Sequence, residues 1–246
     1  MATVQSGPGR IIYQLDMLGA GYPHASTAAG AQAFSQFALN GDLADTDTGV
    51  VPLAKAGGWA RLTSTNEDGK GITIGTSACF SPVLNAPMSI ETRLEMQALT
   101  TTLRVCFVGF CSANAADAAE PLTSTGTTFT PVATDYAGFL LDSQLTALTY
   151  WHMPYRGGAA TSPTVSTDVI CSQAAVAAAS DILRVEVGPD GTVRWILNGK
   201  VEKELADALD TTTLLAAFVG CFSAATTATD IDVNYIRFEA NRDWTV

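Results

Sequence analysis

The segment from residue 182 to 240 decides the fold. It begins ILRVEVGPDGTVRWILNGKVEKEL (182–205) and continues with LLAAFVGCFSA (214–224) and IDVNYIRFEA (231–240). Runs of Val, Ile, Leu and aromatic residues separated by Pro-Asp-Gly and Asn-Gly predict antiparallel hairpins. Asn198 and Gly199 suit a two-residue type I′ turn, because both residue types tolerate the positive φ that its central positions need. We expect the C-terminal quarter to form a β-meander that packs on a sheet supplied by the rest of the chain.

Length and composition indicate one large all-β domain or two small ones. The chain has 246 residues, of which 47% are hydrophobic, which is enough for a core without disulfides or a metal. Charged residues make up 15%, against a typical ~25%, as expected of a protein that packs against neighbours. The net charge of −11 argues against binding nucleic acid through its phosphates. It favours either general solubility or a surface that faces basic patches on a protein partner.

The cysteines carry no metal or disulfide pattern. There are five, with no CxxC spacing: Cys79, Cys106, Cys111, Cys171 and Cys221. Cys106 and Cys111 would point to opposite faces of one strand and so could not share a metal. We expect reduced thiols that act as small hydrophobes, and we predict no cofactor or metal.

No apolar leader is visible in MATVQSGPGR (1–10), and the longest apolar run, Leu214 to Ala225, is far short of the ~20 residues that span a bilayer. The expectation is a soluble protein made in a cytoplasm, with no membrane partner.

Residues 1–50 are predicted to be an N-terminal extension that docks on a neighbouring subunit, and residues 51–246 to be the folded domain. Within the extension, Arg10 to Leu18 is a candidate first strand, and a simple edge strand is the alternative to docking. Beyond it, Pro87 to Ala98 alternates, with Ile90, Thr92, Leu94 and Met96 on one face. Leu103 to Phe110 is almost continuously apolar, as in a strand covered on both sides.

Three further segments complete the prediction. Gly138 to Ser143 and Leu145 to Trp151 form a hairpin. Residues 112–134 and 152–168 are long loops rich in small residues, Gly and Pro. SQAAVAAAS (172–180) is a loop or a brief helix.

Two stretches of the chain are similar in sequence. FVGFCSA (107–113) and FVGCFSA (218–224) match closely, and each has a glycine inside the predicted strand. We expect two equivalent strands of one sandwich, with a bulge or a close backbone approach at the glycines.

Candidate catalytic residues are few. The two histidines, His24 and His152, lie in loop-like segments without a nucleophile nearby, and GxSxG is absent. Glu91 and Glu95 project from one face of a strand, as the two carboxylates of a glycanase would. Arg93 lies between them, and a cation there would lower the pKa of both acids and leave no proton donor. An exposed Glu-Arg-Glu ladder is the preferred interpretation, and no catalytic residue is assigned.

Two kinds of binding site are also considered. Calcium would need spaced oxygen ligands with a turn glycine, and none of the acidic groups shows this pattern: Asp42, Asp45 and Asp47; Asp207 and Asp210; Asp230 and Asp232. The last pair is expected to keep a strand edge solvated. Sugar binding favours exposed aromatic residues, for which Tyr150, Trp151 and Tyr155 are the candidates, with packing in a core or loop as the preferred explanation.

The strand pattern resembles the concanavalin A-like (laminin G-like) jelly roll over about residues 50–242. The stretches that carry the resemblance are LRVEV (183–187), DGTVR (190–194), ILNG (196–199), FVG (218–220) and VNYIRFEA (233–240). Together with Trp59, FVGF (107–110) and AGFLLDS (137–143), the combination resembles structural proteins of tailed-phage particles that carry this jelly roll. The fold itself hosts lectins, glycanases and adhesive modules alike.

The resemblance implies a non-enzymatic virion protein. The first hypothesis is a capsid decoration or cement protein that binds the major capsid protein or other virion proteins, as a homo-oligomer, and stabilises the head shell. The alternative is a carbohydrate-binding, lectin-like module of a phage fibre or tail, with a glycan held near Tyr150–Tyr155. A glycanase that uses Glu95 ranks third.

Overall fold

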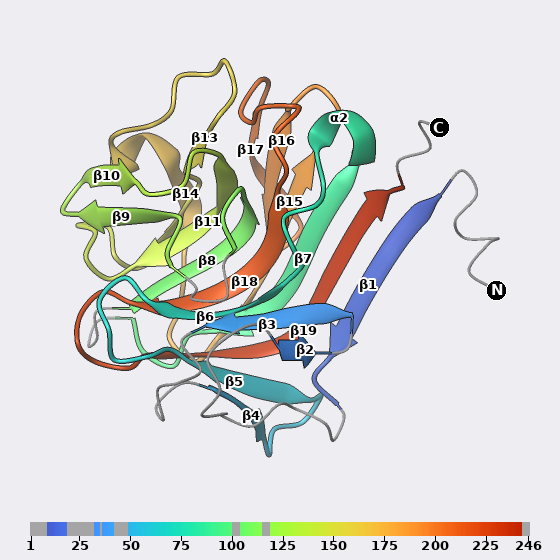
Figure 1. Cartoon of the computed structure of the whole chain (residues 1–246). Coiled ribbons are helices and arrows are strands. Elements are labelled where there is room, and N and C mark those ends of the chain that lie inside the picture. The colour runs from blue at the N-terminus through green and yellow to red at the C-terminus, as the bar shows by residue number, and fades with distance from the viewer. Residues whose placement is uncertain are drawn as a thin grey trace.

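The computed structural model describes residues 9–18, 32–34, 36–41, 49–99, 104–114 and 119–242. Its strands form two large antiparallel sheets that pack on each other as a sandwich (Figure 1). The predicted all-β jelly-roll sandwich is thereby confirmed.

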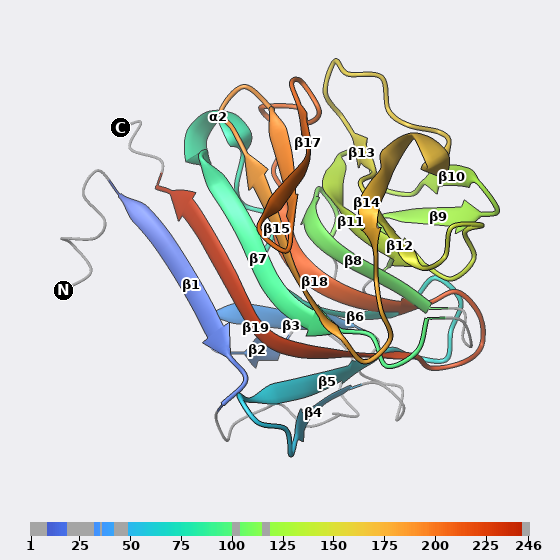
Figure 2. The same ribbon diagram turned by 180° about the vertical axis from the view of Figure 1, so that it is seen from behind.

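Sheet A combines strands from both halves of the chain. Its order is β17 (Lys200–Leu205), β16 (Val193–Leu197), β15 (Ser180–Val187), β7 (Met88–Glu95), β19 (Asp230–Asn241), β5 (Trp59–Thr63) and β4 (Gly49–Leu53). The first part of β19 pairs with β5, and the second part pairs with β1 (Arg10–Asp16). Figure 2 shows β1, β19, β7 and β15 side by side.

Sheet B faces sheet A across the core. Its order is β14 (Ile170–Ala174), β12 (Tyr150–His152), β11 (Tyr136–Asp142), β8 (Arg104–Cys111), β18 (Ala216–Ser223), β6 (Gly71–Gly75), β3 (Phe37–Gly41) and β2 (Gln32–Phe34), and β13 (Tyr155–Arg156) also pairs with β11. Outside the sheets lie the hairpin β9 (Leu122–Thr125) and β10 (Thr128–Pro131), the helix α2 (Pro82–Asn85) and a 3₁₀ turn at Ser166–Val169. In the described residues, no helix is long and apolar enough to cross a membrane.

The predicted hairpins β15–β16 and β16–β17 are confirmed. Asn198 and Gly199 have φ values of 52° and 81°, as a type I′ turn requires. The continuation of the meander beyond β17 is wrong, because β18 lies in the middle of sheet B and β19 in sheet A. Every residue of β18 is buried. A strand that is apolar on both faces is stabilised in the centre of a covered sheet and would be exposed at an edge.

The described part of residues 1–50 contributes strands to both sheets. β1 confirms the strand expected near Arg10 and pairs with β19 over its whole length. β3 pairs with β6 in sheet B. The predicted boundary at residue 50 therefore does not coincide with a break in the sheets, and docking on a neighbouring subunit stays a prediction.

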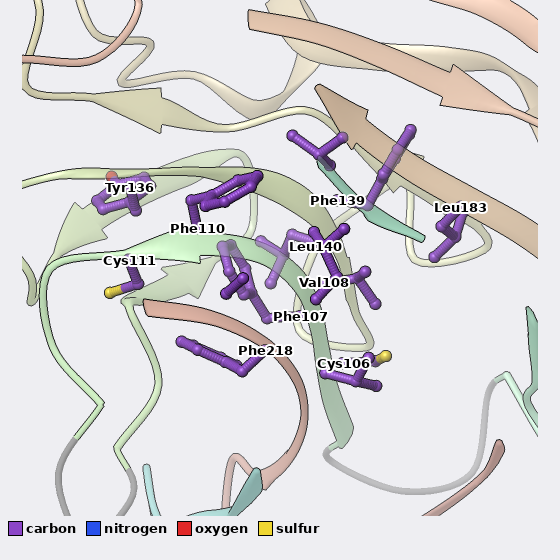
Figure 3. Close-up of a cluster of buried hydrophobic side chains, with 14 of the residues drawn as sticks. Cys106, Phe107, Val108, Phe110, Cys111, Tyr136, Phe139, Leu140, Leu183 and Phe218 are labelled. Atoms are coloured by element: carbon purple, nitrogen blue, oxygen red, sulfur yellow. The ribbon is translucent and has the colours of Figure 1, made fainter. Parts of the chain in front are cut away.

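The two similar stretches, residues 107–113 and 218–224, belong to adjacent strands of sheet B, β8 and β18. Gly109 of β8 lies opposite Phe218 of β18, and Phe107 lies opposite Gly220. The rings of Phe107 and Phe218 are 5.4 Å apart between centroids (Figure 3). A Cβ on Gly109 would lie 2.3 Å from the carbonyl oxygen of Ala137, so β8 and β11 approach each other as closely as a glycine allows. The predicted close backbone approach is confirmed.

Two loop predictions are corrected by the structure. Residues 112–134 contain the hairpin β9–β10, whose Leu122 and Phe129 are buried. Residues 172–174 are the end of β14, which pairs with β12, while residues 175–179 form the predicted loop and no helix. In both places tertiary packing overrides the local preference of Ala-, Ser- and Thr-rich sequence.

Candidate functional site

The outer face of sheet A concentrates the charged side chains of the central strands. On β7, Ile90, Thr92 and Leu94 point into the core, as predicted, while Glu91, Arg93 and Glu95 alternate with them on the outer side. The same alternation puts charged residues of the neighbouring strands on the outer face: Arg184, Glu186, Arg194, Glu204, Arg237 and Glu239.

These side chains pair across the strands. Arg184 Nε lies 2.7 Å from Glu186, and its Nη1 lies 3.1 Å from Glu91. Arg194 lies 2.8 Å from Glu204 and 3.3 Å from Glu186. Burial lowers the pKa of Arg184, but its bonds to Glu186 and Glu91 outweigh this, and the net direction is upward. These ion pairs form a chain of guanidinium and carboxylate groups that runs from Glu204 to Glu91.

A groove of about 470 Å³ opens in this network over Ser89. Ser89 lies directly opposite Glu186 on β15 and opposite Glu239 on β19. Arg10 of β1 forms an ion pair with Glu239. A small residue between two strands that carry long charged side chains leaves space above itself, so Ser89 forms the floor of the groove. Pro87, Met88 and Val187 also line the groove.

The candidate glycanase acids lie further along β7. Glu91 accepts a hydrogen bond of 2.7 Å from the Tyr235 hydroxyl, besides the contact with Arg184. Burial and this bond raise the pKa of Tyr235. Glu95 pairs with Lys55 and accepts a 2.8 Å hydrogen bond from Gln97. The expected exposed ladder is wrong for Glu95, which is 7% exposed. Arg93 bonds to Ser180 at 3.0 Å.

Asp230 and Asp232 do not keep an edge solvated, because β19 is interior to sheet A. Asp232 is buried, bonds to Arg61 Nε at 2.8 Å, and accepts a bond of 2.6 Å from Gln97. The hydrogen bond between Arg61 and Asp232 raises the pKa of Arg61. Asp230 lies 3.2 Å from both Arg61 and Arg104. The pair thus neutralises arginines.

Of the two other acidic groups, the structure describes only Asp207 and Asp210. Asp210 accepts hydrogen bonds from Thr212 and Thr213, which lower its pKa, and Asp42, Asp45 and Asp47 lie outside the described residues. Within the described ranges, no three His, Cys, Asp or Glu side chains are grouped so that they could hold a metal ion.

The aromatic candidates for sugar binding are packed inside. Trp151 is fully buried between the sheets, and its indole nitrogen donates a 2.9 Å hydrogen bond to Asp181. Tyr155 is 8% exposed, packs against Trp195 and donates its hydroxyl to the Thr161 carbonyl oxygen. The preferred explanation, packing, is confirmed for Trp151 and Tyr155, and neither exposes its ring as a sugar platform, while Tyr150 is half-buried.

His152 is also a packing residue, as expected. It is fully buried, and its ring lies edge-on against Phe129 of the hairpin β9–β10. Burial lowers its pKa to about 4, although the backbone at Leu140 and Tyr150 favours the charged form. Neither ring nitrogen makes a well-formed hydrogen bond. His24 lies outside the described residues.

Two buried carboxyl groups were not singled out from the sequence. Burial, with the nearby Asp142 and Asp68, raises the pKa of Glu120 to about 8. Burial raises the pKa of Asp142 to about 6, against the opposing hydrogen bonds from Ser124 and Gln144. Both side chains are less than 6% exposed, and neither lines the groove over Ser89. Asp142 ends β11 and Glu120 precedes β9, so the two lie far apart in the sequence and share no spacing signal.

All five cysteines are free thiols, in agreement with the expectation from their spacing. Cys106, Cys111, Cys171 and Cys221 are buried, and only Cys79 is exposed. Burial raises the pKa of each of them.

Solved structures similar to this chain share its fold. A protein of unknown function, SO2946 from Shewanella oneidensis MR-1, superposes with a TM-score of 0.64 at 11% identity, over 96% of this chain and 89% of that one. The carbohydrate recognition domain of Emp47p gives a TM-score of 0.55 at 11% identity, over 94% and 95%. An endo-1,3-β-glucanase from Streptomyces sioyaensis gives 0.54 at 11% identity, over 94% and 95%. No protein-family model and no curated protein sequence matches the chain.

The fold is therefore the concanavalin A-like jelly roll of these carbohydrate-recognition domains and glucanases. Identities near one residue in nine show the fold alone.

Proposed function

We propose that the protein binds carbohydrate in the groove over Ser89 and does not cleave it. The groove itself carries the proposal, because its walls combine carboxylate acceptors with guanidinium donors, and sugar hydroxyls bond to both. Sugar-binding and sugar-cleaving proteins among the structural neighbours support the same class of ligand.

The charges of the groove favour an uncharged glycan. The lining contains Arg10, Arg184 and Arg194 together with Glu186, Glu204 and Glu239, so the positive and negative groups balance. An anionic sugar would face carboxylates, and a cationic one would face guanidinium groups. A neutral sugar meets donors and acceptors that are already held in place by ion pairs, which lowers the entropic cost of binding.

The acids of this face are poorly arranged for hydrolysis. Glycoside cleavage needs one carboxyl group to donate a proton and a second to act as a base or nucleophile. Glu91 is held by Tyr235 and Arg184, and Glu95 is held by Lys55 and Gln97. Neither offers an unoccupied carboxyl group to a glycosidic oxygen, which supports binding without cleavage.

The role on a phage particle stays a prediction from the sequence. The comparisons contain nothing that concerns capsid decoration, a homo-oligomer or a virion partner.

A glycan array that contains neutral and acidic oligosaccharides tests the proposal, followed by calorimetry on the ligands that bind. We expect binding of neutral glycans, weakened at least about tenfold in Glu186→Gln and Glu239→Gln, since each change removes one charge-assisted acceptor. Incubation with β-glucans should release no reducing ends. A protein that binds no glycan, or one that releases reducing ends in a manner abolished by Glu95→Gln, contradicts the proposal.

A further inference from the structure

We infer that Trp59 is a second sugar-contacting residue of the same face, a stacking platform for a pyranose ring that the Lys55 side chain now covers. The inference rests on the proposed carbohydrate binding and extends it from the groove to the opposite end of sheet A.

Trp59 occupies an unusual place for a buried tryptophan. Ala60 and Leu62 of β5 point into the core, so the alternation of the strand puts Trp59 on the outer face with Arg61. Its side chain is nevertheless only 3% exposed, and it is not part of the hydrophobic core between the sheets. Trp151 and Trp195, by contrast, belong to that core.

Two cations lie over the indole. Lys55 Nζ is 3.9 Å from the ring centroid, and Arg93 Cζ is 5.3 Å from it. Lys55 belongs to the β4–β5 turn, in which Gly57 and Gly58 both have positive φ. Its side chain remains 36% exposed. A long side chain on a turn can rotate into solvent without moving a strand, because the hydrogen bonds that the Asn234 side chain donates to the carbonyl oxygens of Gly57 and Gly58 do not involve it.

The contacts of Lys55 are those that a sugar ring can replace. Its ammonium group lies on the indole face and donates to Glu95. The C–H face of a pyranose packs on an indole in the same position, and a ring hydroxyl donates to a carboxylate. Departure of Lys55 therefore leaves neither the ring nor Glu95 without a partner once the sugar is bound. The ligand class is a neutral pyranose with one apolar face.

The experiment combines fluorescence quenching with glycan titration. We compare wild type, Lys55→Ala, Trp59→Phe and the double variant. Lys203→Ala is the matched control, because Lys203 Nζ lies 4.8 Å from the ring centroid of Tyr155 and covers an aromatic ring outside this site. Acrylamide quenching should rise in Lys55→Ala and return to the wild-type level when Trp59→Phe is added. Glycan affinity should rise about fivefold in Lys55→Ala and fall below wild type in the double variant, while Lys203→Ala changes neither quantity.

The outcomes separate the two proposals. Unchanged quenching in Lys55→Ala, or a glycan affinity that neither Lys55→Ala nor Trp59→Phe changes, contradicts sugar stacking on Trp59. Either result leaves the proposed binding in the groove over Ser89 standing. Absence of any glycan binding by wild type and Lys55→Ala overturns carbohydrate binding itself. Should Lys55→Ala fail to fold, Lys55→Ser also removes the long side chain from the indole, and its affinity and quenching decide in the same way.

Discussion

The indole nitrogen of Trp195 donates a hydrogen bond of 2.9 Å to the carbonyl oxygen of Gly138. Trp195 belongs to β16 of sheet A and Gly138 to β11 of sheet B, so this bond crosses the sandwich. Only a glycine fits at position 138, because a Cβ there would lie 2.5 Å from the ring of Phe107. The bond fixes how the hairpin β15–β16 packs against sheet B.

Trp195→Phe is expected to destabilise the protein by about 2–4 kcal/mol, because it leaves a buried carbonyl oxygen unpaired and a cavity beside it. Urea unfolding followed by circular dichroism measures the difference. Val201→Ala, on the exposed side of β17, is the control and should change stability by less than about 0.5 kcal/mol. Equal stability of Trp195→Phe and wild type would show that the cross-sheet bond contributes nothing.

Trp151→Phe should reduce stability and leave sugar binding unchanged. The change removes the donor to Asp181, a carboxylate that is 8% exposed and that also accepts a 2.9 Å bond from Asn198. We expect a loss of about 1–3 kcal/mol in unfolding free energy. A variant that keeps its melting temperature but loses glycan affinity would restore the loop at Tyr150–Tyr155 as the binding site.

Glu120 should make the protein less stable in alkali. Its pKa is raised from 4.5 to about 8. The folded protein keeps a proton that the unfolded chain releases, so this contribution to stability is full below about pH 4.5 and is lost as the pH rises through 8. Asp142, with a pKa of about 6, has largely titrated by pH 7. Wild type should therefore lose about 1 kcal/mol relative to Glu120→Gln between pH 7 and pH 9. Parallel stability curves for the two proteins over this range would contradict the assignment.

Thiol labelling should distinguish Cys79 from the other four cysteines. Burial raises the pKa of Cys111 to about 12 and of Cys221 to about 11. The native protein should react with a thiol reagent at one site per chain, slowly because the pKa of Cys79 is also raised by partial burial, and at five sites after unfolding. Cys79→Ser serves as the control and should abolish labelling of the native protein. Rapid labelling of Cys106 would show that β8 opens.

The fold could be predicted from the sequence because the signals for hairpins are local. Asn198-Gly199 and the alternation along residues 182–205 depend only on turn chemistry and on the two-residue period of a strand. The position of β18 could not be predicted in this way, since an apolar strand can be central in either sheet. The hairpin β9–β10 was missed because its Thr- and Ser-rich strands become ordered by packing Leu122 and Phe129.

The site was only partly accessible. Alternation alone puts Arg184, Glu186 and Glu239 on an outer face, and this signal was available in LRVEV and IRFEA. The groove depends on Ser89 lying between Glu186 and Glu239, which requires the order β15–β7–β19. No period or spacing encodes the order of strands that are distant in sequence. The residues that the sequence pattern offers as candidates, Glu91, Glu95 and Trp151, do not line the groove.

The most direct measurement of the central claim is the glycan affinity of Ser89→Leu against that of Ser89→Ala. Leucine fills the groove from its floor, while alanine keeps it open, and both leave the ion pairs of Glu186 and Glu239 in place. The account predicts at least about a tenfold loss of affinity in Ser89→Leu, near wild-type affinity in Ser89→Ala, and similar melting temperatures for both. Equal glycan affinity in Ser89→Leu and wild type would contradict it.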